Sequence, residues 1–96
     1  MAREKYILVK HFCEQTHITH TFVKNLFEYG LVSYEEKEDA VFIDENDILE
    51  IERMFRLHHD LGINFEGLDV IKRMLERMQK LEKEMDNLQK RLRLYE

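Results

Sequence analysis

The spacing of apolar residues divides the chain into a head of mixed periodicity and one long amphipathic helix. Between residues 9 and 29, apolar side chains recur every three or four positions, which is the spacing of one helical face. Short β-prone runs at 5–9, 31–34 and 40–43 predict strands. From residue 65 the helical spacing continues almost to the C-terminus. The pattern therefore predicts a mainly α-helical fold with a small amount of β-structure.

The first two helical stretches predict a helix-turn-helix. One stretch covers 9–15, the helical pattern breaks at 16–18, and Thr19 is placed to cap the next helix with its side-chain oxygen. This second helix ends at Gly30 and is expected to bury a stripe formed by Phe22, Val23, Leu26 and Phe27. Two short helices joined by a tight turn are the elements of a helix-turn-helix.

The next part of the chain predicts a hairpin and a third helix. The runs 31–34 and 40–43 flank the acidic residues 35–39, so we expect a β-hairpin, which would be the wing of a winged helix-turn-helix. Asp44 is placed to cap the third helix, and Asp47 follows three residues later. Acidic side chains at this helix start suit the helix dipole.

Residues 56–67 form the joint between the third helix and the last one. Gly62 stands where a helix end favours a residue that can adopt positive φ. Asn64 stands at the expected N-cap of the last helix. Gly67 is unfavourable in a first helical turn, which indicates close approach by a neighbouring element.

The last helix contains two apolar series. The first consists of Leu68, Ile71, Leu75 and Met78, and the second of Leu81, Met85, Leu88, Leu92 and Tyr95. A continuous heptad would place an apolar residue at Glu82 rather than Leu81, so we interpret the shift as a stammer. We expect the first series to pack on the head and the second to form a coiled-coil seam in a homodimer. The alternative is a single helix folded back on the head.

Length and composition indicate one domain, with a winged helix-turn-helix head at 1–63 and the long C-terminal helix at 64–96. The 96 residues are 44% hydrophobic and 36% charged, so an additional interface would help to stabilise a small core. The single cysteine, Cys13, cannot form an internal disulfide, and we recognise no signal peptide or membrane-spanning apolar run. We therefore expect a cytoplasmic protein.

The formal net charge of −5 is concentrated in one segment. Residues 1–30 and 56–96 each carry a balance of +1, whereas residues 31–55 carry two basic and nine acidic residues, a balance of −7. Such a segment is a poor surface for DNA phosphates and a good one for a basic protein. Simple solvation of the wing is the alternative interpretation.

The residues that suggest chemistry do not form a catalytic or metal-binding motif. His17 and His20 lie three positions apart near His11 and Cys13, but the spacing matches no strong zinc motif. We interpret the histidines as surface or capping residues and Cys13 as a small core residue. Because we find no glycine-rich phosphate loop and no Ser/His/Asp set, we expect no enzymatic activity, no cofactor and no metal.

Residues 17–31, followed by the wing and Asp47-Ile48, resemble the head of the MerR regulators, which place a long dimerising helix after a winged helix-turn-helix. A narrower resemblance, to the CbpM chaperone modulators of the same fold, covers nearly the whole chain. It is carried by Phe12-Cys13, Gly30-Leu31-Val32, Val41-Phe42, the joint and the leucine-rich tail.

The chain departs from the DNA-binding MerR members at two places. Their recognition helix typically carries an arginine followed by two aromatic residues, whereas this chain has Lys24, Asn25 and Leu26. Their wing ends in a basic signature, whereas this wing ends in the apolar run 40–43. Since phosphate contacts need basic side chains, these departures disfavour DNA binding, although Lys10 and Lys24 leave a weak form of it open.

The resemblance to CbpM implies a protein that binds the J-domain of a CbpA/DnaJ-type co-chaperone and blocks its stimulation of Hsp70. From charge and placement we expect the J-domain to contact Glu35, Glu36, Glu38, Asp39, Asp44, Asp47 and Glu50. The first alternative is a MerR-type DNA-binding transcriptional regulator, and the second is a coiled-coil adaptor for another client.

Overall fold

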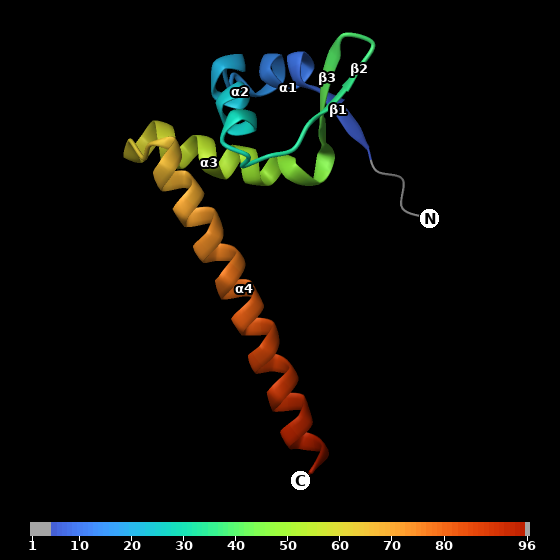
Figure 1. The fold of residues 1–96 in the computed structure, drawn as a ribbon, viewed down its shortest axis with the longest axis vertical. Helices are drawn as coiled ribbons and strands as arrows, with labels where there is room; N and C mark the ends of the chain where they lie inside the picture. Colours follow the sequence, from blue (N-terminus) through green and yellow to red (C-terminus); the bar gives the residue numbers. More distant parts are fainter. Residues whose placement is uncertain (1–4, 96) are drawn as a thin grey trace.

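The computed structural model describes residues 5–95 and consists of a small head from which one long helix projects (Figure 1). Residues 1–4 and 96, which the sequence assigned to the head and the last helix, lie outside the described residues. The elements are, in order, β1 (Tyr6–Leu8), α1 (Val9–Thr16), α2 (His20–Glu28), β2 (Glu35–Lys37), β3 (Ala40–Asp44), a 3₁₀ turn η1 (Glu45–Asp47), α3 (Ile48–Leu61) and α4 (Phe65–Leu94). This order confirms the predicted winged helix-turn-helix head and long C-terminal helix.

The predicted helix-turn-helix is formed by α1 and α2. α1 ends at His17, whose left-handed backbone (φ 63°) turns the chain while its N–H donates to the Cys13 carbonyl at 3.0 Å. Thr19 then caps α2, because its Oγ1 accepts a hydrogen bond from the Phe22 N–H at 3.1 Å. The predicted cap is confirmed, and Cys13 is buried in the core as expected.

The wing differs from the prediction in its first strand. Leu31 and Val32 are buried, with 1% and 7% of their surface exposed, and the Leu31 N–H donates to the Leu26 carbonyl at the end of α2. Leu31 and Val32 therefore close the core at the end of α2, and residues 31–34 do not form the predicted strand. β2 begins only at Glu35 and pairs antiparallel with β3 around a turn in which Glu38 and Asp39 have positive φ.

The sheet is larger than the predicted hairpin. β1 pairs antiparallel with β3, so the strand order is β1-β3-β2 and β3 is the central strand. The fully buried Ile43 of β3 lies opposite Ile7 and joins the sheet to the helices. The buried core consists of Val9, Phe12, Cys13, Ile18, Phe22, Val23, Leu26, Leu31, Val32, Ile43, Ile51, Met54 and Leu68.

The joint between α3 and α4 confirms the predicted capping residues. Gly62 ends α3 with φ 67°, and Asn64 Oδ1 accepts a hydrogen bond from the Gly67 N–H at 2.8 Å. A Cβ at Gly67 would lie 2.8 Å from Ile63 Cγ2, so the close approach comes from the joint itself rather than from a separate element. His58 Nδ1 donates to the Ile63 carbonyl at 2.8 Å, which adds a side-chain link across the joint.

Aromatic rings fix the start of α4 on the head. Phe65 lies 5.5 Å from Phe22, 4.9 Å from His58 and 5.4 Å from Tyr29, measured between ring centroids. The Tyr29 hydroxyl also donates to Glu66 Oε1 at 2.9 Å. These contacts connect the end of α2, the end of α3 and the first turn of α4.

The apolar residues of α4 follow a different division from the predicted one. Leu68 is buried and Ile71 and Leu75 are half-buried, but Met78 is 54% exposed, so its expected packing on the head is wrong. Apart from Val70 and Leu94, the exposed apolar positions of α4 and its C-cap form a regular series that starts at Met74, because the steps alternate between four and three residues. This exposed series consists of Met74, Met78, Leu81, Met85, Leu88, Leu92 and Tyr95.

The exposed series removes the need for a stammer. The stammer is expected between Met78 and Leu81 because this step of three residues follows the step of three from Leu75 to Met78, but the structure places Leu75 among the half-buried residues. Counted from Met74, the heptad spacing is continuous within one unbroken helix. Every residue from 76 to 95 is exposed, so this part of α4 does not fold back on the head.

Candidate functional site

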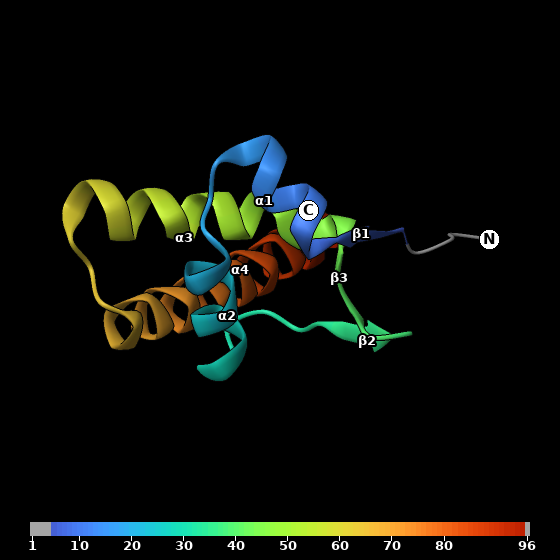
Figure 2. The same ribbon diagram turned by 90° about the horizontal axis from the view of Figure 1, so that it is seen from above.

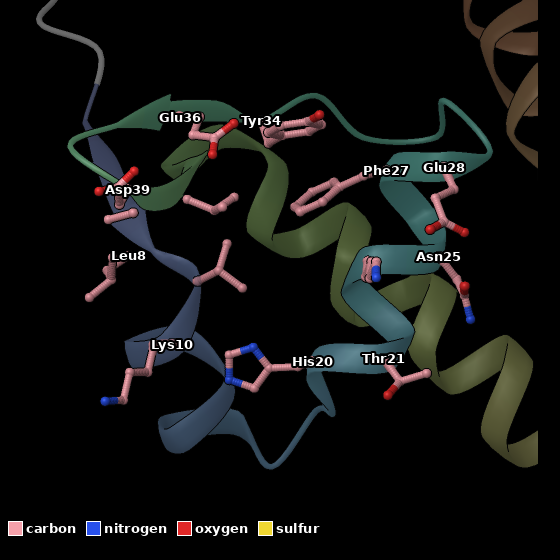
Figure 3. A pocket seen from close by; sticks show the side chains of 14 residues that line it. Leu8, Lys10, His20, Thr21, Asn25, Phe27, Glu28, Tyr34, Glu36 and Asp39 are labelled. Atoms are coloured by element: carbon pink, nitrogen blue, oxygen red, sulfur yellow. The ribbon is translucent and has the colours of Figure 1, made fainter.

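An open groove of about 920 Å³ lies between α2 and the wing. Its walls come from the end of β1 and start of α1, from the outer side of α2, and from β2 and β3 (Figure 3). Viewed from above, the extended segment after α2 leads along one side of the head to β2 and so connects the two walls (Figure 2). The groove is thus built by all parts of the winged helix-turn-helix.

The floor of the groove is mainly apolar. Phe27 lies in the last turn of α2 and Tyr34 directly before β2, and their ring centroids are 4.6 Å apart. Leu8 and Val41 are half-buried and line the groove from β1 and β3. Tyr34 is 50% exposed, so much of this aromatic surface can be covered by a partner.

Charged residues lie at both ends of this floor. Glu36 and Asp39 are at the wing end, and Lys10 of α1 is at the opposite end (Figure 3). Lys24 and Glu28 of α2 also line the groove. Among residues 5–95, no hydrogen bond or ion pair engages the side chains of Lys10, Lys24, Glu36 or Asp39. Both signs of charge are therefore available for intermolecular contacts.

Only two of the seven predicted contact residues line the groove. Glu36 and Asp39 do so, whereas Glu35 and Glu38 are exposed on the wing but are not part of the groove lining. The alternation of side chains along a strand explains why Glu35 and Glu36 differ.

The other three predicted residues lie at the start of α3. Asp44 Oδ1 accepts from the Asn46 N–H at 2.8 Å, so Asp44 caps η1 and not the third helix as predicted, and the N-cap of α3 is Asp47, which makes no side-chain cap hydrogen bond. Glu50 Oε2 lies 3.8 Å from Arg53 Nη1. The predicted acidic residues therefore form a wing group and a separate α3 group.

Asp47 of the α3 group lies in an electrostatically unfavourable position. Partial burial raises the pKa of its carboxyl above the ordinary value of 3.8, and the nearby Asp44 and Glu50 raise this pKa further. Lys72 of α4 acts in the opposite direction. Since the Lys72 ammonium also donates to the Leu31 carbonyl, Asp47 faces the contact between the head and α4.

The sequence did not identify the aromatic part of the groove. Phe27 was assigned to the buried stripe of α2 and Tyr34 to a strand, yet the structure places both in the groove lining. The two residues are seven positions apart, but Gly30 between them ends the predicted helix, so no periodic pattern in the sequence indicated that the two rings meet. The contact depends on the path of residues 29–34, which only the folded chain fixes.

The histidines and Cys13 do not come together. Residues 5–95 contain no group of three or more His, Cys, Asp or Glu side chains that could hold a metal ion. Burial raises the pKa of the Cys13 thiol, as expected for a core residue. Within the same residues, no helix is long and apolar enough to cross a membrane.

Comparison with protein families agrees with this architecture. The family described as MerR HTH family regulatory protein matches residues 7–90, which include the helix-turn-helix, the wing, the joint and most of α4. The chain belongs to the MerR family of helix-turn-helix regulatory proteins. A search of curated proteins finds no significant match.

Membership of the MerR family gives the groove a structural context. In a DNA-binding helix-turn-helix, the second helix enters the major groove, and here that helix is α2. The α2 wall of the groove is therefore the surface that a DNA-binding MerR protein would direct at its target. In this MerR protein, the same surface adjoins the carboxylates of Glu36 and Asp39.

Proposed function

We propose that this MerR-family protein is a chaperone modulator that binds the J-domain of a CbpA/DnaJ-type co-chaperone and blocks its stimulation of Hsp70. The proposal needs no catalysis and no cofactor, and we expect the protein to act in the cytoplasm. The observation that carries it is the acidic wing beside a partly apolar groove. The resemblance of the joint and tail to CbpM chaperone modulators supports the same proposal.

The charge of the wing favours a basic protein over DNA. Residues 35–39 carry four carboxylates and only Lys37, a balance of −3, next to the α2 surface. A phosphate backbone on α2 would meet this negative charge, which opposes association. A J-domain helix with a basic face would be attracted to it, and the attraction would mainly increase the association rate.

The size of the electrostatic effect is modest for each ion pair. Exposed pairs contribute about 0.2–1 kcal/mol each, so two pairs at Glu36 and Asp39 correspond to roughly a 2- to 30-fold change in affinity. The apolar floor must supply much of the remaining binding free energy. This combination of an apolar centre and a charged rim is usual for protein interfaces.

Titration calorimetry of the full chain against the J-domain tests this proposal. We expect saturable binding that weakens as salt increases, and inhibition of J-domain-stimulated ATP hydrolysis by Hsp70. The variant Glu36→Gln/Asp39→Asn should bind more weakly and with a shallower salt dependence. Asparagine is chosen at position 39 because it tolerates the positive φ of 63° found there.

A matched control removes two carboxylates far from the wing. Glu82→Gln/Glu84→Gln changes the net charge equally on exposed positions of α4 and should leave J-domain affinity unchanged. Equal affinities for the wing variant and the wild type would exclude Glu36 and Asp39 from the interaction. Absence of binding by the wild-type chain at low salt would refute the proposed function.

A MerR-type DNA-binding regulator is the second candidate function. The family membership favours it, and α2 carries Thr21, Lys24 and Asn25 in the groove wall, where they are suited to phosphate and base contacts. Fluorescence anisotropy with duplex DNA tests this candidate. Saturable binding with a steep salt dependence, lost in Lys24→Ala, would support it over the J-domain proposal.

We also propose that the exposed series of α4 forms a homodimer. Its residues are 52–89% exposed and repeat with heptad spacing over the free part of the helix. An uncovered stripe of this length is unfavourable in water. Sedimentation of the full chain and of a chain truncated before Leu81 tests the proposal. If both chains sediment as monomers, the proposed dimer is refuted.

A further inference from the structure

The charges in the groove point to a partner that carries both signs. Glu36 and Asp39 lie at the wing end, Lys10 lies at the other end, and Leu8 lies between Asp39 and Lys10 (Figure 3). A purely basic partner would satisfy only the wing end and would be repelled at Lys10. The acidic segment alone therefore does not account for the recognition surface.

We propose that the groove binds one amphipathic helix of the partner, oriented by its charges. An apolar side chain of that helix packs on Phe27 and Tyr34, a cationic side chain faces Glu36 and Asp39, and a carboxylate faces Lys10 and Lys24. This inference rests on the proposed function because it takes the J-domain as the partner. It adds an apolar anchor and an acidic residue on the J-domain that the charge of the wing does not predict.

The dimensions of the groove are consistent with one face of a helix. A helix with its side chains is about 10–12 Å wide, so it can lie along an open groove while only its inner side chains enter. A volume of about 920 Å³ can hold several such side chains. Tyr34 is half-exposed and its ring is tilted by 36° against the ring of Phe27, a contact that partly orders this aromatic surface before binding.

Ordered aromatic side chains that become buried in an interface often account for much of its affinity. Tyr34 and Phe27 lie next to Glu36 at the wing end of the groove (Figure 3), so the apolar and the cationic side chain of the partner helix would be neighbours. Lys10 and Lys24 then determine which way a partner helix lies, because reversing the helix would place like charges together at both ends. The lysines are therefore expected to determine specificity as well as affinity.

DNA fits this charge arrangement less well. A phosphate backbone could pair with Lys10 and Lys24, but it would also approach Glu36 and Asp39. It has no cationic group for the wing end. An amphipathic protein helix can satisfy both ends and cover the apolar floor at the same time.

The first test is calorimetry of the full chain and the J-domain with variants at the anchor. Tyr34→Ser should weaken binding at least 10-fold, because it removes the exposed ring from the floor of the groove. Leu94→Ser, at a residue that is 83% exposed at the end of α4 and lies outside both the groove and the exposed series, is the control and should leave the affinity within twofold. Circular dichroism of each variant checks that the head remains folded.

The second test concerns the acidic residue on the partner. Lys10→Glu should weaken binding about 5- to 10-fold, whereas Lys83→Glu on exposed α4 should not. When single Asp and Glu residues of the J-domain are changed to Lys, one of these changes should restore binding to Lys10→Glu. If no single change on the J-domain restores binding to Lys10→Glu, the proposed contact between Lys10 and a carboxylate of the partner is refuted.

Backbone amide shifts in the wild-type chain provide a measurement that needs no variant. Addition of the J-domain should shift residues 8–10, 20–28 and 34–41 most strongly. If the J-domain binds but these shifts are confined to the start of α3, or if all groove variants bind normally, the groove inference is wrong and the proposed function stands. If the wild-type chain does not bind the J-domain, both are wrong.

Discussion

Replacing Leu88 by serine should weaken self-association of the chain strongly. Full burial of a leucine side chain contributes about 1.5–3 kcal/mol, and 57% of Leu88 is exposed and free to be buried in a dimer. The contribution is therefore roughly 1–1.5 kcal/mol for each chain and about 2–3 kcal/mol for a dimer. This corresponds to about a 30- to 150-fold increase in the dimer Kd.

Sedimentation equilibrium over a range of concentrations measures this Kd. Gln79→Ser is the control, because Gln79 is exposed on α4 and lies outside the exposed series, while its change to serine reduces helix propensity to a similar extent. The control should retain the wild-type Kd. An unchanged Kd for Leu88→Ser, in a chain that is dimeric as wild type, would show that the dimer forms through another surface.

Three further predictions concern the stability of the head and joint, each measured by urea unfolding. Thr19→Ala should lose about 1 kcal/mol because it removes the cap to the Phe22 N–H, whereas Thr21→Ala should have a much smaller effect. Gly62→Ala should destabilise by about 1–2 kcal/mol because alanine is strained at φ 67°; equal stability would refute the assigned strain. Asp47→Asn should be more stable than wild type at neutral pH, because the raised pKa means that ionised Asp47 is disfavoured in the fold.

The sign of the Asp47 effect follows from proton binding. Between the ordinary pKa of 3.8 and the raised pKa in the fold, the native state binds more protons than the unfolded chain. Stability of the wild type therefore falls as the pH rises through this interval. The advantage of Asp47→Asn should disappear below pH 3.8, where Asp47 is protonated in both states; an advantage that persists there would have another cause.

The sequence by itself determined the helices, their caps and the joint. Thr19, Gly62 and Asn64 act on groups within four or five positions along the chain, so their effect can be predicted without knowing the fold. The split between head and long helix was predictable for the same reason, because it follows from a change in local periodicity. The family resemblance came from these same local features.

Tertiary structure decided which apolar residues are covered. Leu31 and Val32 have the composition of a strand, but the end of α2 places them in the core, and the strand moves to the acidic residues after them. In α4, Met74 and Leu75 are adjacent and both apolar, and only packing on the head separates the exposed one from the half-buried one. Local propensity cannot make these distinctions, since they depend on contacts between distant segments.

The groove was also decided by tertiary structure. Its charged and aromatic residues come from α1, α2, the segment after α2 and the wing, and no interval along the chain connects Lys10 with Glu36. The sequence located the excess acid in residues 31–55 but could not separate Glu36 and Asp39 from the carboxylates at the start of α3. The fold makes that separation, because the strand pairing of the wing places one group beside α2 while the other remains at the helix start near α4.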